Sequence, residues 1–214
     1  LELNQLSEAV FKNFEKRTIQ RSIKKAEKEG VHIREENTMA GMEEFFRLNK
    51  LTRKKHGVPS QPRRFFESLF RNMVANGLAF ILLAECDSKV ISSGIFLKFN
   101  STIYYKYNAS DPVYLASKTP NHLLTWHAIK KGCDEGCRKF DFGRTLQENS
   151  GLIRHKLMWV AKALDLPYYY YPEIGGSAAK EGNGFLYRMA TGVWKVLPDR
   201  ITDMLSPIVM KQIA

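Results

Sequence analysis

The spacing of apolar positions predicts helices in the first third of the chain. From Ser7 to Gly30 it predicts one helix, with Ser7 as the N-cap and Gly30 as the residue that ends it. Apolar residues recur at helical spacing in residues 38–55, and Pro62 opens a further helix. A short alternating strand at residues 31–34 lies between the first two helices.

From Leu78 the apolar period changes to that of strands. Three β-rich runs are separated by short polar turns, and they cover residues 78–86, 90–99 and 102–109. Because short turns join antiparallel neighbours, we expect a meander. Within it, Tyr105 is expected to face the opposite side of the sheet from Tyr104 and Tyr107.

Helices and strands alternate beyond the meander. Thr119 is predicted to cap a helix that begins at Pro120. The later elements are expected to be a strand at 138–142, a helix at 150–163, a strand at 166–171, and a broken helix at 185–213 interrupted at Pro198 and Pro207. A helix between the meander and the next strand implies a parallel crossover. We therefore expect the α/β (α+β) class, with a mixed, mostly antiparallel sheet flanked by helices and a C-terminal amphipathic helix.

Length and composition fit one globular domain. The 214 residues suit a single domain over 1–214, with a basic N-terminal helix at 1–30 and a helical tail at 185–214. The content of 44% hydrophobic and 26% charged residues excludes disorder, collagen and coiled coil as descriptions of the whole chain. No apolar run reaches the ~18 residues of a membrane span, and the first residues carry no signal pattern. The absence of an initiator Met suggests that the chain is trimmed or part of a longer protein.

Basic residues outnumber acidic ones, 33 to 22, which gives a net charge of +11. This balance favours a phosphate-rich partner. Six basic residues fall in the second half of the first predicted helix: Lys16, Arg17, Arg21, Lys24, Lys25 and Lys28. They form either a solvated helix face or a cationic ridge for phosphate groups. The three cysteines are not spaced as a metal-ligand set, so no metal is expected.

Several motifs carry a resemblance to a known family. They are Asn121-His122-Leu123-Leu124 with Trp126, Phe140-Asp141-Phe142-Gly143-Arg144, Gly151-Leu152 with Lys156 and Trp159, and His56-Gly57-Val58-Pro59. With the element order, these resemble the FemAB/FemX-like branch of the GNAT acyltransferase superfamily. The resemblance implies transfer of an amino acid from aminoacyl-tRNA to an amine of a cell-envelope precursor, in the cytoplasm. It also implies a missing second domain, because this chain resembles the C-terminal one of two.

Amide formation from an activated ester needs a neutral amine, aligned reactants and a stabilised oxyanion, but no covalent enzyme intermediate. Ordinary GNAT enzymes cradle the coenzyme A pyrophosphate on a Gly-rich turn after the meander, which residues 110–119 lack. We therefore expect aminoacyl-tRNA as donor substrate with no cofactor required. Acetyl-coenzyme A stays as the alternative donor.

Lys156 is the leading catalytic candidate. The resemblance puts a functional lysine at this position, where it stabilises negative charge in the transferred group. The helix around it is expected to bury an apolar stripe of Ile153, Leu157, Val160 and Leu164. This chain has His155 where the branch usually has Phe, and Val160 where glycine is common.

Asp141 and Arg144 lie at a strand end, where ligand crevices of open α/β sheets are found. Asp141 is a second catalytic candidate, as acceptor of the amine proton or as an orienting group, and Arg144 is a clamp for phosphate or carboxylate. An internal ion pair between the two is the alternative. The other substrate-binding candidates are His155, Trp159, and, in an exposed loop, Arg53 and His56.

The leading hypothesis is thus an acyltransferase that joins an activated aminoacyl or acyl group to an amine. One rival is a coenzyme A-dependent N-acyltransferase of an unrelated small amine, and another is a non-catalytic RNA- or membrane-binding module that uses the basic first helix. The apolar side of the C-terminal helix is expected to dock on the domain. Peripheral contact with the inner membrane face is the alternative.

Overall fold

The computed structural model describes residues 1–169, 171 and 185–213. The chain divides into two compact units, which are residues 1–52 with 63–163, and residues 53–62 with 164–214. We call them the first and the second unit. The single domain over 1–214 stays a prediction.

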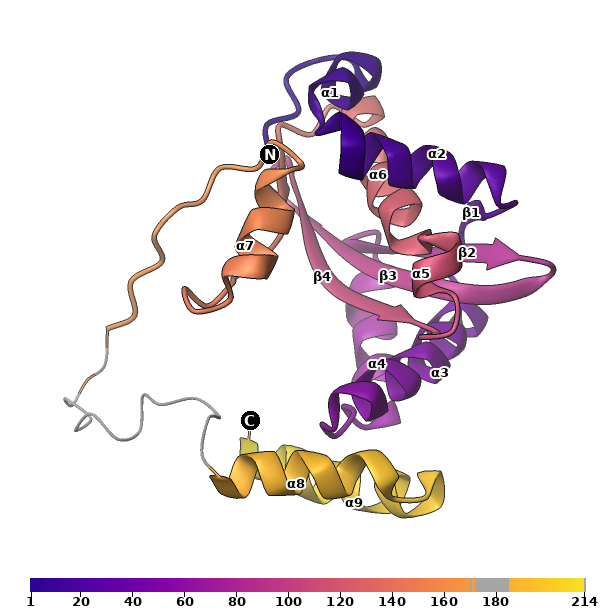
Figure 1. The fold of residues 1–214 in the computed structure, drawn as a ribbon, viewed down its shortest axis with the longest axis vertical. Coiled ribbons are helices and arrows are strands. Elements are labelled where there is room, and N and C mark those ends of the chain that lie inside the picture. Colours follow the sequence, from indigo (N-terminus) through magenta and orange to yellow (C-terminus); the bar gives the residue numbers. More distant parts are fainter. Residues whose placement is uncertain (170, 172–184, 214) are drawn as a thin grey trace. The chain divides into compact units, whose positions relative to one another are not determined.

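A five-stranded sheet forms the centre of the first unit (Figure 1). In spatial order its strands are β1 His32–Glu35, β2 Ala79–Cys86, β3 Lys89–Phe99, β4 Thr102–Ser110 and β5 Lys139–Asp141. All neighbours are antiparallel except β4 and β5, which are parallel. The two hairpins turn through residue pairs with positive φ, 87–88 and 100–101, as type I′ turns require. The predicted meander and the mixed, mostly antiparallel sheet are confirmed.

Helices cover both faces of this sheet and create two cores. One face carries α1 Ser7–Asn13, the π-helical turn η1 Lys16–Gln20, α2 Arg21–Lys28 and α6 Pro120–Asp134. The other carries α3 Met39–His56, α4 Arg63–Leu69 and the π-helical turn η2 Phe70–Val74. The short α5 Leu115–Lys118 precedes α6, and α7 Ser150–Leu157 follows β5.

A β-bulge at Lys106 sets the directions of the tyrosines in β4. Phe96 pairs with Tyr105 and Ile95 with Tyr107, so Lys106 is the extra residue. Strict alternation would place Tyr105 and Tyr107 on one face. Because of the bulge, Tyr105 packs in the core under α6 and Tyr107 in the core under α3, as expected.

The predicted single helix from Ser7 to Gly30 is wrong, because the chain breaks at Phe14. This residue is extended (ψ 150°) and its ring is buried against Trp126 and Trp159. The helix restarts after Glu15, whose carboxylate accepts the N–H groups of residues 17 and 18. Ser7 is the first helical residue rather than the N-cap.

The helix predicted at 150–163 ends at Leu157, and its assigned apolar stripe is wrong. Leu157, Val160 and Leu164 are 48%, 47% and 88% exposed, whereas Trp159 is 1% exposed. The helix ends there because Val160 is left-handed (φ +60°) and the carbonyl of residue 158 accepts the N–H of residue 15. The strand predicted at 166–171 is also wrong for its described residues, 166–169 and 171.

Thr119 is also not a side-chain cap of α6. It has a left-handed backbone (φ +46°), and its hydroxyl donates to the carbonyl of Ser22 in α2. This bond ties the start of α6 to α2. The sequence signal of a threonine before Pro120 therefore marks the correct boundary through a different contact.

The second unit contains α8 Phe185–Val196 and α9 Asp199–Ile213. The predicted break at Pro198 is confirmed, but Pro207 lies inside α9 and does not interrupt it. Exposed apolar side chains include those of Val193, Val196 and Met204. None of the described helices combines the length and the hydropathy needed to cross a membrane.

Candidate active site

Three segments of the first unit bring aromatic and imidazole rings together. His122 comes from the first turn of α6, Phe142 from the loop after β5, and His155 and Trp159 from α7 and the turn after it. The His122 ring stacks on Trp159 at a centroid distance of 6.1 Å and meets His155 edge-on at 5.4 Å. Phe142 lies 6.0 Å from Trp159. We call these four residues the ring cluster.

Lys156 lies beside the ring cluster and holds the loop that follows β5. Its ammonium donates to the carbonyls of Phe142 (2.7 Å), Gly143 (2.8 Å) and Arg144 (3.4 Å). An ammonium has three N–H donors, so these carbonyls use its full capacity. Burial lowers the pKa of Lys156, and the Asp141 carboxylate opposes this effect. The side chain of Lys156 is partly buried, and its contacts are those of a positioning group.

Asp141 supports the same loop from its other end. Its carboxylate accepts the N–H of Gly143 at 2.6 Å, which closes a tight turn in which Gly143 has φ +72°. Only glycine adopts such a φ without strain. Asp141 and the side chain of Arg144 are exposed at this turn. The structure thus brings Asp141, Arg144, His155, Lys156 and Trp159 into one neighbourhood.

His122 is the site residue that sequence reasoning missed. Its Nε2 is buried and, among the described residues, has no hydrogen-bond partner. Burial, with the nearby His155, lowers the pKa of His122 to about 4, so its imidazole is neutral at pH 7. The Nε2 of His155, by contrast, lies 3.4 Å from the indole N–H of Trp159. Burial and then Lys156 lower the pKa of His155.

The sheet opens next to the ring cluster. β4 pairs with β5 only at residues 102–104, and β4 continues to Ser110 with no partner on that side among the described residues. Gly143 lies at the point of divergence, where a Cβ would be 3.7 Å from the Tyr105 carbonyl oxygen. Burial raises the pKa of Tyr105 to about 12, so its phenol stays protonated. The described strands thus separate beside the rings.

A buried polar network fixes the start of α6 against the sheet. The amide oxygen of Asn121 accepts hydrogen bonds from the hydroxyls of Ser92 (2.6 Å) and Ser110 (2.7 Å). Thr52 bonds to the main chain of Ser110 in both directions. This network holds the residue next to His122 in place.

The prediction that Arg53 and His56 lie in an exposed loop is wrong. Both residues lie in the last turn of α3. Gly57 ends the helix in a Schellman arrangement (φ +71°), in which the N–H of Val58 donates to the carbonyl of Arg53. Burial, followed by the charges of Lys55 and Arg53, lowers the pKa of His56. Both residues belong to the second unit, and their contact with an acceptor stays a prediction.

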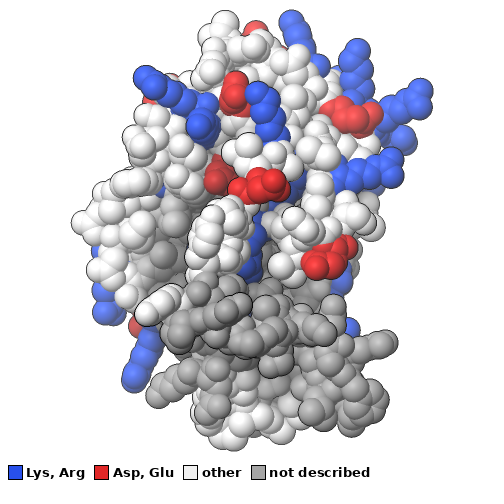
Figure 2. Space-filling model, turned by 90° about the vertical axis from the view of Figure 1, so that its left-hand side faces the viewer, with Lys and Arg blue, Asp and Glu red and all other residues white. Residues whose placement is uncertain are grey.

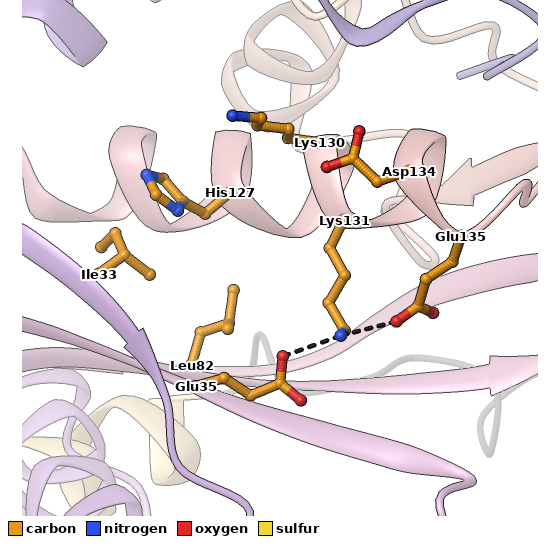
Figure 3. A pocket seen from close by; sticks show the side chains of 8 residues that line it. All are labelled: Ile33, Glu35, Leu82, His127, Lys130, Lys131, Asp134 and Glu135. Atoms are coloured by element: carbon orange, nitrogen blue, oxygen red, sulfur yellow. Dashed lines mark ion pairs between the residues drawn. The ribbon is translucent and has the colours of Figure 1, made fainter.

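A hollow of about 400 Å³ lies near the other end of α6 (Figure 3). His127, Lys130 and Asp134 line it from the helix, and Glu35 and Leu82 from the sheet. The Lys131 ammonium bonds to the carboxylates of Glu35 (2.9 Å) and Glu135 (2.6 Å). The charges of Lys131 and these two carboxylates are thus paired. No three His, Cys, Asp or Glu residues in the described ranges are grouped to hold a metal ion.

This fold and site define a GNAT acyltransferase. The sequence model of the acetyltransferase (GNAT) domain family matches residues 13–156 of this chain. The chain therefore belongs to this family. It is therefore a transferase, and the predicted resemblance to the FemAB/FemX-like branch is confirmed by the relatives found.

One relative is UDP-N-acetylmuramoylpentapeptide-lysine N(6)-alanyltransferase of Weissella viridescens. It is 26% identical over 107 residues, which are 49% of this chain and 32% of that protein. The crystal structure of FemX superposes with a TM-score of 0.66 at 17% identity, over 74% of this chain and 56% of FemX. The structure of the aminoglycoside acetyltransferase AAC(6')-Iy superposes with a TM-score of 0.51 at 16% identity, over 67% of this chain and 99% of that protein. These two structures show the fold alone, and the chain covers about a third of the alanyltransferase and about half of FemX.

Proposed function

We propose that this chain transfers an aminoacyl group from aminoacyl-tRNA to an amine of a cell-envelope precursor. The observation that carries the proposal is the match to an alanyltransferase that acts on a lysine amine of a muramoyl pentapeptide. Because the chain covers about half of FemX, the proposal includes a second domain that takes part in acceptor binding. The cytoplasm, with peripheral contact at the inner membrane face, is the location where such precursors and tRNA meet.

The ring cluster contains a group that can take the proton of the attacking amine. A neutral His122 with a buried, unpartnered Nε2 can accept a hydrogen bond from the attacking amine and receive its proton as the C–N bond forms. The ester C–O bond to the tRNA ribose then breaks, and the imidazolium returns the proton to the leaving ribose oxygen. Trp159 and His155 orient that imidazole. Lys156 and Asp141 act as positioning residues, since both hold the loop of residues 142–144. The guanidinium of Arg144, which is exposed at this loop, binds a phosphate or carboxylate of the substrate.

The crossover between β4 and α6 does not fit a coenzyme A pyrophosphate. It contains no glycine, and α5 occupies it. The main-chain N–H groups of Asp111, Val113, Tyr114, Lys118 and His122 already donate within the chain. A phosphate cradle depends on several free N–H groups pointing to one place. This arrangement supports a donor other than coenzyme A.

The test compares two donors with one acceptor. The purified chain is incubated with labelled alanyl-tRNA or acetyl-coenzyme A and a lysine-containing muramoyl pentapeptide. Transfer that ribonuclease abolishes supports the proposal. Transfer from acetyl-coenzyme A that ribonuclease leaves unchanged supports the rival, an N-acyltransferase, for which the fold likeness to AAC(6')-Iy is the specific observation.

A further inference from the structure

The outward face of α2 is a row of cations opposite a buried apolar face. Ile19, Ile23 and Ala26 are buried against the core under α6. On the opposite side of the helix lie the exposed side chains of Arg17, Arg21, Lys24, Lys25 and Lys28. Figure 2 shows Lys and Arg side chains projecting from the upper part of the molecule, the end that carries α1 and α2 in Figure 1.

The positive charge of this row is not neutralised by its neighbours. Within the described part of the chain, the side chains of Arg21, Lys24 and Lys28 form no ion pair or hydrogen bond. Two of the nearby carboxylates are engaged elsewhere: that of Glu15 caps η1, and that of Glu29 pairs with Lys118 at 3.2 Å, which leaves Glu27 as the carboxylate beside the row. The row therefore keeps an attractive potential for phosphate.

The cationic row begins at the ring cluster. The ring of Phe14 lies 5.0 Å from Trp159, and the N–H of Glu15 donates to the Met158 carbonyl at 3.0 Å. Arg17, the first cation of the row, follows Glu15 by two residues. A polymer whose reactive end is at the ring cluster can thus follow the row away from it.

α2 is a rigid support for such a polymer. The Lys25 ammonium donates to the Ala116 carbonyl at 2.9 Å, and the Thr119 hydroxyl donates to the Ser22 carbonyl at 2.9 Å. These bonds fasten α2 to α5 and to the start of α6. Since the apolar side of α2 is already buried, it is not available for insertion into lipid.

We propose that the exposed face of α2 binds the phosphodiester backbone of the donor RNA. This inference rests on the proposed function and adds the surface on which the RNA lies. RNA is favoured over a membrane because lipid binding scales with apolar area, and the exposed face of α2 is made of cations with only Glu27 beside them. The RNA 3′ end would enter at the ring cluster with its backbone along Arg21, Lys24 and Lys28.

The test measures affinity for unacylated tRNA across a salt series. The double variant Arg21→Gln with Lys24→Gln is compared with Arg64→Gln with Arg71→Gln, two exposed residues on α4 and η2 across the sheet. We expect the α2 variant to bind at least about tenfold more weakly at low salt, with the slope of log K against log[salt] reduced by about two. The control variant is expected to keep the wild-type affinity and slope. Thermal melts verify that both variants fold.

The outcomes separate this inference from the proposed function. If wild-type protein binds tRNA and the α2 variant binds it as tightly as the control variant does, α2 is not the RNA-binding surface. The proposal that aminoacyl-tRNA is the donor is then unaffected. If wild-type protein does not bind tRNA, both fail. If the α2 variant loses binding to phosphatidylglycerol vesicles but not to tRNA, a membrane is the partner and the inference is overturned.

Discussion

Helix α6 presents two histidines, His122 in its first turn and His127 in its middle, and the two regions differ in how their polar groups are satisfied. His127 lies beside the network in which Lys131 bonds to Glu35 and Glu135 (Figure 3). His122 lies among rings, and its buried Nε2 has no partner in the described structure. Burial lowers the pKa of both imidazoles.

This difference indicates which region of α6 has a polar group that a substrate can pair with. Around His127 the opposite charges already compensate one another, so a ligand would have to displace an ion pair. Around His122 a buried ring nitrogen is left without a partner among the described residues, which costs about 1–3 kcal/mol unless a partner arrives. A substrate amine is such a partner. A pocket alone therefore does not mark the active site, whereas an unpaired buried group beside an open strand does.

The strongest test of this comparison is His122→Ala against His127→Ala. Loss of a group that receives the amine proton is expected to lower kcat by about 10²–10³-fold, and the His127 variant is expected to keep wild-type activity within about threefold. Initial rates of labelled transfer from alanyl-tRNA measure both. An equal loss in the two variants would show that α6 matters only as a scaffold.

The second test uses the acid side of the stability curve. The pKa of His122 is about 4 in the folded protein and about 6.5 when unfolded. Protonation therefore favours the unfolded state, and stability present above pH 6.5 falls as the pH drops toward 4, by about 3 kcal/mol at most. We expect His122→Gln to remove this part of the pH dependence in urea unfolding.

His32→Gln is the matched control, since His32 is exposed on β1. It is expected to follow the wild-type pH dependence. A His122→Gln curve parallel to the wild type between pH 6.5 and 4 would mean that the imidazole is not buried in its neutral form.

The third test concerns Lys156 as a positioning residue. Lys156→Met removes three hydrogen bonds to the loop of residues 142–144, which is expected to lower the free energy of unfolding by about 1–2 kcal/mol. We expect kcat to fall about tenfold as the loop loosens, with faster proteolysis at that loop. Lys156→Arg is expected to restore much of the loss, because a guanidinium also donates to carbonyls.

Lys130→Met, an exposed position on α6, is the control and should leave stability, proteolysis and transfer unchanged. If Lys156→Met lost all transfer while its loop stayed as protected as in the wild type, Lys156 would be a catalytic residue, as the family resemblance implies.

The sequence predicts the sheet better than the site, and the reason is the range of the interactions. The strands of the meander are bounded by turn residues a few positions apart, so local periodicity defines them. The break at Phe14 and the end of α7 coincide with long-range contacts, which are those of the Phe14 ring with Trp126 and Trp159 and that of the Glu15 N–H with the Met158 carbonyl. Helical spacing therefore assigned the buried stripe to Leu157 and Val160, which the structure exposes.

The candidate residues show the same limit. The resemblance predicts Lys156 and the strand end predicts Asp141, but their partners are main-chain groups of the loop at 142–144, which side-chain patterns do not reveal. The orphan nitrogen of His122 depends on rings from two other segments. The signal that the sequence does contain is a histidine in the first turn of the helix that follows the meander.

The smallest expected effect is at Val160, where the family resemblance leads us to expect glycine. Its φ of +60° costs a non-glycine residue about 1–2 kcal/mol, and a β-branched side chain is especially unsuited to it. The side chain is half exposed, so little packing is lost on its removal. Val160→Gly is therefore expected to raise the free energy of unfolding by about 1 kcal/mol, measured by urea denaturation.

Val113→Gly, at an exposed site without positive φ, is the control and is expected to be neutral or slightly destabilising. Since Val160 follows Trp159 directly, a stabilised Val160→Gly protein with unchanged kcat would show that the strain does not serve the ring cluster, whereas a loss of kcat would make this strained turn part of the site.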